Sequence, residues 1–209
     1  MWFKEIYHEL YRILLVVILK IRKRGGVFPI IWGVKYLHIN SLDNSINILT
    51  DKLEKVSVFL YGSGHQLLIE RDVIFKKGMI WFEDKNCSIV IREKTTIEEA
   101  EISAAEDGMH IAIEKDCMLS SGIRISTTDS HSIISLDTNK RINEAGSVLI
   151  ENHVWIGHNA TICKGIHIGH DTIIGTNSVV THDIPPSVVA AGVPARIVKS
   201  NVTWNRKRI

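Results

Sequence analysis

The sequence predicts an all-β protein folded as a parallel β-helix, in which short strands wind around a triangular core. The first observation behind this prediction is a series of isoleucines spaced six residues apart, which Val180 continues. A period of six fits neither the 3.6 residues of a helical turn nor the alternation of an ordinary strand, and it is typical of hexapeptide repeats. The spaced positions are Ile150, Ile156, Ile162, Ile168 and Ile174.

The second observation is that the same register continues toward the N-terminus. Five apolar segments align with one another, and their starts are successively 22, 22, 37 and 18 residues apart. A triangular coil of three hexapeptides takes about 18 residues, so an offset of 22 predicts a coil with a small insertion at a corner. The segments begin at Leu67, Ile89, Ile111, Val148 and Ile166.

The third observation is the irregular offset of 37, which exceeds one coil by about 19 residues. The excess falls in a polar stretch between Ile125 and Val148 that interrupts the period. We therefore expect residues 126–147 to project from the prism as a loop. Loops on rigid repeat scaffolds commonly carry function.

Residues 1–26 are expected to form an N-terminal helical segment. Residues 3–24 suit an amphipathic helix that ends at Gly25-Gly26. The apolar run Ile13–Leu19 is too short for a membrane span, and no small-residue cleavage site follows it. Two placements stay open: the helix packs on the prism or a neighbouring subunit, or its basic end lies on an anionic membrane surface.

The remainder of the chain is expected to form one β-helix domain over residues 27–198, followed by a basic tail over residues 199–209. A length of 209 residues suits one repeat domain with short additions. The net charge of +2 is near neutral for this length, so it does not indicate a nucleic-acid-binding protein. Basic residues gather at both ends of the chain, as solvated termini or as an anion-binding feature.

The cysteines indicate a reducing compartment. Cys87, Cys117 and Cys163 are odd in number and show no CxxC pairing, so neither a disulfide framework nor a thiolate zinc site is suggested. We therefore expect a cytoplasmic protein, with peripheral placement at the inner face of the membrane left open by the N-terminal segment.

Motifs over about residues 111–204 resemble the hexapeptide-repeat acetyltransferases, the group that contains galactoside, maltose and capsule O-acetyltransferases. The shared motifs are Trp155-Ile156-Gly157-His158-Asn159-Ala160, Asp183-Ile184-Pro185-Pro186 and Gly192-Val193-Pro194-Ala195-Arg196. A second set resembles the bacterial polysialic acid O-acetyltransferases of capsule synthesis. That set is Thr128-Asp129-Ser130-His131, Arg141-Ile142-Asn143 and Asn201-Val202-Thr203-Trp204.

This resemblance implies a left-handed parallel β-helix and a homotrimer with three active sites at subunit interfaces. It also implies acetyl-CoA as co-substrate, no metal, and direct transfer of the acetyl group without an acyl-enzyme. The acceptor implied is a hydroxyl of a cell-surface carbohydrate, with polysialic acid favoured by the second set of motifs.

His131 is the candidate general base. Acetyl transfer from a thioester to a sugar hydroxyl requires a positioned base, and histidine suits this role because its ordinary pKa lies near operating pH. His131 lies in the projecting loop, where the resemblance places the catalytic histidine. Asp129 and Ser130 next to His131 suggest a catalytic triad with Ser130 as the nucleophile. We reject this triad because adjacent residues of an extended loop point to different sides. Asp129 is left either orienting the imidazole or capping the loop turn.

Trp155 is the second candidate catalytic residue. It stands directly before Ile156-Gly157, and the resemblance gives a matching tryptophan a place in the active site. Its indole would line the acceptor pocket, while a nearby backbone N–H would stabilise the developing oxyanion. The alternative is that Trp155 packs at the trimer interface.

The resemblance also supplies candidate CoA-binding residues, carried over from the galactoside enzymes. Arg196 and Lys199 keep the cationic character that a phosphate requires. His182 replaces a usual lysine, which weakens phosphate pairing at pH 7. The six candidates are His158, Thr176, Thr181, His182, Arg196 and Lys199. Arg141 and Arg124 are candidate cations for an acidic acceptor.

Two other functions are kept as alternatives. His153 and His158 stand five residues apart, as do two zinc ligands in the gamma-class carbonic anhydrases, which share a β-helix. The position expected for a third ligand is Cys117, however, and His110 is only a loose substitute. A non-catalytic β-helix module is the other alternative, against which the loop histidine and the CoA-like tail both argue.

Overall fold

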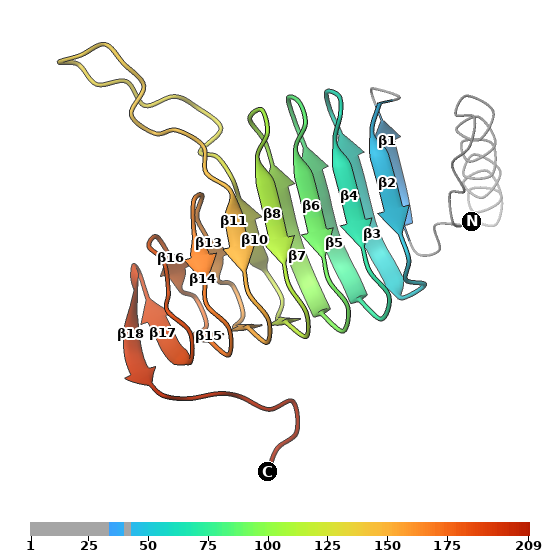
Figure 1. Ribbon diagram of the computed structural model, residues 1–209, viewed down its shortest axis with the longest axis vertical. Helices are drawn as coiled ribbons and strands as arrows, with labels where there is room; N and C mark the ends of the chain where they lie inside the picture. The colour runs from blue at the N-terminus through green and yellow to red at the C-terminus, as the bar shows by residue number, and fades with distance from the viewer. Residues whose placement is uncertain (1–33, 40–42) are drawn as a thin grey trace, which may run out of the picture. The chain divides into compact units, whose positions relative to one another are not determined.

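The computed structural model describes residues 34–39 and 43–209, and all regular structure in those ranges is β. The strands wind in successive coils around one core, and neighbouring strands pair in parallel except at the C-terminal end (Figure 1). The expected all-β parallel β-helix is therefore confirmed. The helical segment expected over residues 1–26 lies outside the described residues. No helix among the described residues is long and apolar enough to cross a membrane.

The first face of the prism is a six-stranded parallel sheet. Its register reproduces the offsets expected from the sequence, since Leu67 pairs with Ile89, Ile89 with Ile111, Ile111 with Val148, and Ile150 with Ile168. The strands are β2 (Ser45–Ile48), β4 (Gln66–Ile69), β6 (Ser88–Ile91), β8 (His110–Ile113), β11 (Val148–Ile150) and β14 (His167–Ile168).

In the N-terminal coils, long strands run across the two remaining faces. They are β3 (Leu53–Leu60), β5 (Ile74–Phe82) and β7 (Thr96–Ala104). The strand β1 (Val34–Ile39) pairs with the later part of β3. The start of β7 pairs with β9 (Met118–Leu119), and its end pairs with β10 (Ile123–Ser126). From that coil onward a turn separates the two faces.

The second face then consists of β9, β12 (Trp155–Ile156), β15 (Ile173–Ile174) and β17 (Val188–Gly192). The third face consists of β10, β13 (Thr161–Ile162) and β16 (Val179–Val180). We call the turns from the first face to the second the first corner. The turns from the third face back to the first are the third corner, which is opposite the second face in a triangular section.

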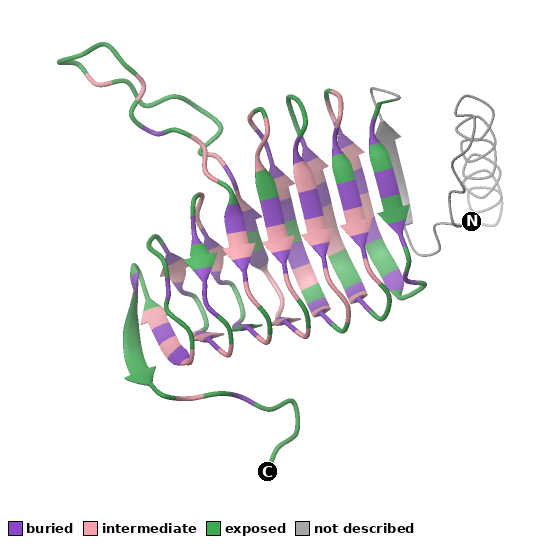
Figure 2. Ribbon diagram, in the orientation of Figure 1, coloured by how far each residue is buried: buried purple, intermediate pink, exposed green. Residues whose placement is uncertain are grey.

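The repeat positions supply the core of the prism. Ile150, Ile156, Ile162, Ile168, Ile174 and Val180 are all 0% exposed. Among strands β2 to β17, buried positions recur between exposed or half-buried ones, so one side of each of these strands faces inward (Figure 2). Burial of branched aliphatic side chains stabilises such a stack, because each coil covers the apolar surface of its neighbour.

The first corner turns through a residue in the left-handed conformation in five successive coils. Asp and Asn adopt this conformation more readily than most residues, because their short side chains hydrogen-bond locally. The repetition stacks side chains that are distant in sequence, which brings Asp116, His153 and Asp171 into one column. The residues are Asp72, Lys94, Asp116, His153 and Asp171, with φ between 56° and 63°.

The chain ends with a feature that the repeat pattern does not show. β18 (Ala195–Ser200) pairs antiparallel with β17, and the tail after it turns back along the prism (Figure 1). Trp204 in this tail is buried. The tail is therefore attached to the prism through Trp204, while most of its other side chains are exposed.

Candidate active site

The expected loop leaves the third corner between β10 and β11, and it extends away from the strands in Figure 1. Its two ends are joined at the root, because Gly146 N donates to Thr127 O at 2.9 Å. Gly165 N donates in turn to Gly146 O at 2.9 Å, which attaches the root to the next coil. A Cβ on Gly146 would lie 2.6 Å from Gly165 Cα, so only glycine permits this approach.

An ion pair fixes the next layer of the loop. Arg141 forms a bidentate pair with Glu106 of the preceding coil, with Nη1 2.6 Å from Oε2. Hydrogen bonds from the Arg141 guanidinium and the Thr128 hydroxyl lower the pKa of Glu106 to about 2. A doubly hydrogen-bonded carboxylate holds its arginine in one geometry, so both strands of the loop are tied to the prism.

Asn143 links the two sides of the loop beneath His131. Its Oδ1 accepts from Ile133 N at 2.7 Å, and its Nδ2 donates to His131 O and to Asp129 Oδ2, each at 2.8 Å. Lys164 also donates to Asp129. The hydrogen bonds from Lys164 and then Asn143 lower the pKa of the Asp129 carboxyl below its ordinary value. Asp129 is thus engaged with the loop root, which favours the capping alternative over the orientation of the imidazole.

His131 is therefore held by its backbone while its ring stays exposed. His131 N donates to Asp129 O at 2.8 Å, and His131 O accepts from Asn143. Within the part of the chain that the structure describes, no hydrogen bond engages the His131 ring. An exposed imidazole on a fixed backbone can exchange a proton with a bound hydroxyl.

Trp155 lies on the opposite side of the prism from the root of this loop. It points outward from β12 on the second face, between Met118 and Ile173 of the adjacent strands, and is 38% exposed. Within one chain the structure therefore does not bring the two candidate catalytic residues together.

The six candidate CoA residues are all exposed and fall into three places. His158 and Thr176 lie on stacked turns, since His158 O accepts from Asn177 N at 2.8 Å. Thr181 and His182 follow β16 at the third corner. Arg196 and Lys199 lie on β18, paired with Ala191 and Val189 of β17. The candidates for cationic contact with an acidic acceptor are already paired, Arg141 with Glu106 and Arg124 with Glu101 at 3.3 Å.

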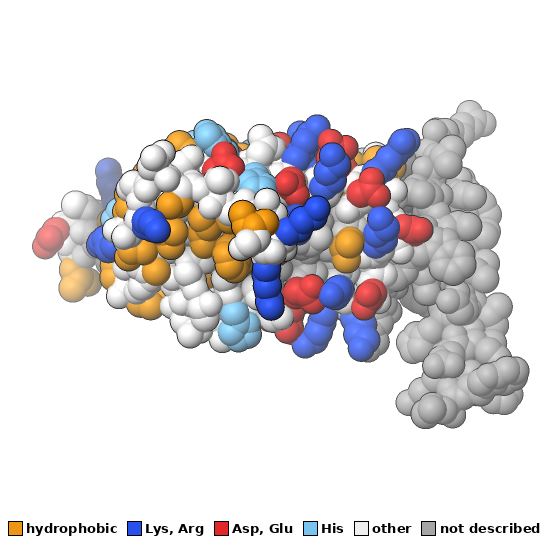
Figure 3. Space-filling view, turned by 90° about the horizontal axis from the view of Figure 1, so that it is seen from below, with side chains coloured by type: hydrophobic (Ala, Val, Ile, Leu, Met, Phe, Trp, Pro, Cys, Tyr) orange, Lys and Arg blue, Asp and Glu red, His pale blue; other side chains and the backbone are white. Residues whose placement is uncertain are grey.

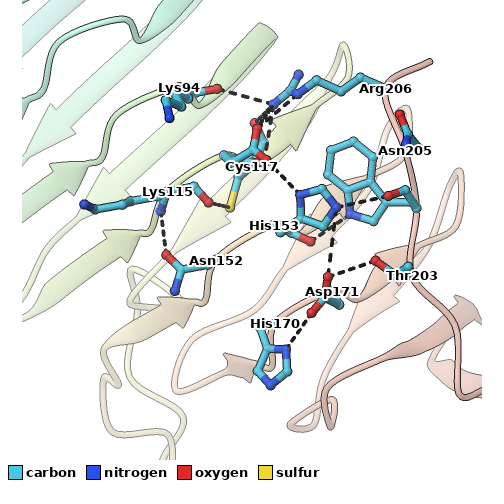
Figure 4. A network of polar contacts seen from close by, with 12 residues as sticks. Lys94, Lys115, Cys117, Asn152, His153, His170, Asp171, Thr203, Asn205 and Arg206 are labelled. Atoms are coloured by element: carbon cyan, nitrogen blue, oxygen red, sulfur yellow. Dashed lines mark hydrogen bonds and ion pairs between the residues drawn. The ribbon is translucent and has the colours of Figure 1, made fainter.

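The first corner, next to the second face, carries a surface feature that sequence reasoning missed. Residues 203–206, which we call the C-terminal strap, cross the first corner over the column of Asp171, His153 and Asp116 (Figure 4). The Trp204 ring stacks on His153 at 4.2 Å with 7° between the planes, and its centroid lies 6.1 Å from that of Trp155. Seen from below, hydrophobic side chains gather over the C-terminal coils, and charged ones over the N-terminal coils (Figure 3).

The contacts of His153 argue against the zinc alternative. Its Nδ1 lies 2.9 Å from Asp116 Oδ2, and its Nε2 lies 3.0 Å from Trp204 O. Both ring nitrogens are thus occupied by oxygen atoms of the protein, so neither nitrogen is left for a metal. Burial raises the pKa of Cys117 to about 12, so this thiol stays protonated and donates to Glu151 O.

Comparisons with known proteins agree with this geometry. The family profile described as "Bacterial transferase hexapeptide (six repeats)" matches residues 147–182. A polysialic acid O-acetyltransferase of Neisseria meningitidis is 41% identical over 167 residues, which cover 79% of this chain and 77% of that protein. A second one, from Escherichia coli O1:K1 / APEC, is 32% identical over 138 residues, covering 66% of this chain and 42% of that protein.

Two solved structures share the architecture. The polysialic acid O-acetyltransferase OatWY superposes with a TM-score of 0.73 at 35% identity, covering 83% of this chain and 92% of that one. The polysialic acid-specific acetyltransferase NeuO gives 0.67 at 27% identity, covering 84% and 82%. The chain therefore belongs to the hexapeptide-repeat O-acetyltransferases, whose fold is the left-handed parallel β-helix. Within that family it is similar to the polysialic acid enzymes.

Proposed function

We propose that this enzyme transfers the acetyl group of acetyl-CoA directly to a hydroxyl of a capsular polysaccharide, and that polysialic acid is the first acceptor to test. His131 takes the proton of the attacking hydroxyl, and Trp155 lines the acceptor side of the reactive centre. The proposal assigns the reaction to the cytoplasm, where the three free cysteines stay reduced.

The observation that carries the proposal is the exposed imidazole of His131 above a fixed loop root. A general base needs a free nitrogen and a defined position, because proton transfer requires a heavy-atom approach of about 3 Å. The contacts of Asn143, Arg141 and Lys164 supply the position. The acceptor class comes from the polysialic acid enzymes to which the chain is similar.

A homotrimer with composite sites completes the proposal. His131 and Trp155 leave opposite sides of one prism, so they meet only where the loop of one subunit reaches the second face of another. The loop carries exposed apolar side chains that suit such a contact, because burying them against another subunit removes apolar surface from water. They are Ile133, Ile134, Leu136 and Ile142, with Leu136 99% exposed.

The CoA site is proposed to involve the six exposed residues named above. Arg196 and Lys199 on β18 offer two cations for the phosphates, and the stacked turns of His158 and Thr176 offer backbone groups for the pantetheine arm. Thioester cleavage releases the CoA thiol, while the acetyl carbonyl carbon forms a bond to the acceptor oxygen. The proton passes from that oxygen to His131 and then to the thiolate.

The test measures thiol release from acetyl-CoA by the purified full chain, with polysialic acid, other capsular polysaccharides and neutral glycans as acceptors. We expect release that depends on an acidic capsular glycan and a fall in kcat of about 10² to 10⁴ in His131→Asn. His110→Asn is the matched control, because His110 is also exposed but pairs with Ser88 on the first face. Wild-type turnover in a folded His131→Asn variant rejects the base, and no release with any acceptor rejects the function.

A further inference from the structure

We propose that the C-terminal strap is part of the reactive centre, with Trp204 as a positioning residue that holds the indole of Trp155. The inference rests on the proposed function only in that Trp155 is assigned to the acceptor side there. The contacts of the strap stand independently of that assignment.

Trp204 is fixed on the prism by three contacts with one residue. Its ring stacks on the imidazole of His153, its Nε1 donates to His153 O at 2.7 Å, and its carbonyl lies 3.0 Å from His153 Nε2. The side chain is 7% exposed, although its neighbours in the tail are exposed. A ring stacked and hydrogen-bonded in this way has one orientation.

Both ends of the strap are anchored, and they lie on different coils. Thr203 Oγ1 donates to Asp171 Oδ1 at 2.8 Å. Arg206 donates to Asp116 Oδ1 at 3.1 Å and to Cys117 O at 2.9 Å, and its guanidinium lies 5.4 Å from the Trp204 ring centroid. These contacts fix Trp204 relative to three coils, those of Asp171, His153 and Asp116.

The consequence concerns the orientation of Trp155. β12 has two residues, and the Trp155 side chain points outward from it. The ring that borders it is Trp204, at 6.1 Å with 52° between the planes, which is a favourable tilted arrangement. A displacement of about 1 Å at a reacting centre can lower the rate by about 10²-fold. The strap can therefore affect kcat by fixing the position of Trp155, without itself touching the substrate.

The experiment compares Trp204→Ala with Trp204→Phe in the assay above. We expect Trp204→Ala to lower kcat or raise the KM for the glycan by about tenfold, while the KM for acetyl-CoA changes less than about twofold. Trp204→Phe keeps the stacked ring and should recover most of the loss. Trp81→Ala is the matched control, because Trp81 contacts Phe59 and Tyr61 on the N-terminal coils, away from the strap.

A second measurement does not depend on activity. Hydroxyl-radical footprinting with mass spectrometry reports the oxidation of Trp155 itself, which should rise several-fold in Trp204→Ala and stay near wild type in Trp204→Phe and Trp81→Ala. If wild-type enzyme acetylates no glycan, the proposed function fails, and footprinting still decides whether Trp204 orders Trp155.

Two outcomes overturn the inference. One is a folded Trp204→Ala variant with wild-type Trp155 oxidation, kcat and glycan KM. The other is a loss that affects the KM of both substrates equally and follows the melting temperature, because that marks a purely structural role. If Trp204→Ala does not fold, Arg206→Gln loosens the strap without touching Trp155, and unchanged footprinting and kinetics in that variant overturn the inference as well.

Discussion

Two carboxylates of the loop root act as fixed negative charges. Glu106 is paired with Arg141 and Asp129 with Lys164, and these hydrogen bonds keep both pKa values below their ordinary range. Each pair joins the loop to a coil that is distant in sequence. The position of His131 thus depends on side chains that never approach the reacting atoms.

Glu106→Gln should loosen the loop and destabilise the protein in a pH-dependent way. The pKa of Glu106 is lowered from 4.5 to about 2, so the ionised carboxylate stabilises the folded state fully above pH 4.5. That contribution is lost as the pH falls through about 2. The difference in free energy of unfolding between wild type and variant, measured by urea at several pH values, should therefore shrink between pH 4.5 and about 2.

Glu101→Gln is the control for this measurement. Glu101 pairs with Arg124 across adjacent strands, but both side chains are largely exposed, and exposed pairs contribute little. A Glu106→Gln difference that is as small as that of Glu101→Gln, or that stays constant with pH, contradicts the anchoring role.

At the scale of the elements, β9, β12 and β15 are two-residue strands of the second face, each with one inward and one outward side chain. In the second face the inward file is Leu119, Ile156, Ile174 and Ala190, all at most 1% exposed. Strands of two residues have few hydrogen bonds of their own. Their stability therefore depends on the apolar stack rather than on the strand.

Ile174→Ala should lower the free energy of unfolding by about 2–5 kcal/mol, because it leaves a cavity in the inward stack. The neighbouring outward residue of β15 offers a matched control of the same type. Ile173→Ala should lower the free energy of unfolding much less, because the Ile173 side chain is only half-buried. Chemical denaturation of both variants decides the matter, and equal losses would show that the face assignment of β15 is wrong.

At the scale of the whole molecule, the two candidate catalytic residues stand on opposite sides of the described prism. A loop that projects from the third corner and carries exposed isoleucines and a leucine is suited to reach another copy of the chain. This arrangement makes the composite site testable without a structure of the assembly.

Co-expression of His131→Asn and Trp155→Ala should restore activity that neither variant has alone. In a trimer whose sites combine His131 of one chain with Trp155 of another, random assembly from equal amounts leaves about one quarter of the sites intact. Light scattering checks the trimer, and thiol release measures the recovery. No recovery in mixed trimers would mean that both residues serve the same site from one chain.

The sequence by itself determined the fold, the register and the location of the loop. The isoleucines six apart are fully buried, the offsets of 22, 22, 37 and 18 reappear in the strand pairing, and the loop lies between Ser126 and Val148. These features were accessible because a repeat places the same kind of side chain in the same environment in every coil. The motifs around His131 and Trp155 also indicated the class of enzyme.

Only the tertiary structure decided how the non-repeating parts attach to the prism. The pairing of Arg141 with Glu106 and the stacking of Trp204 on His153 join residues that are 35 and 51 positions apart. Neither contact follows from a period, because the loop and the tail lie outside it. The repeat fixes where each coil runs, whereas the partners of a segment that leaves the coils depend on where its path brings it back to the surface.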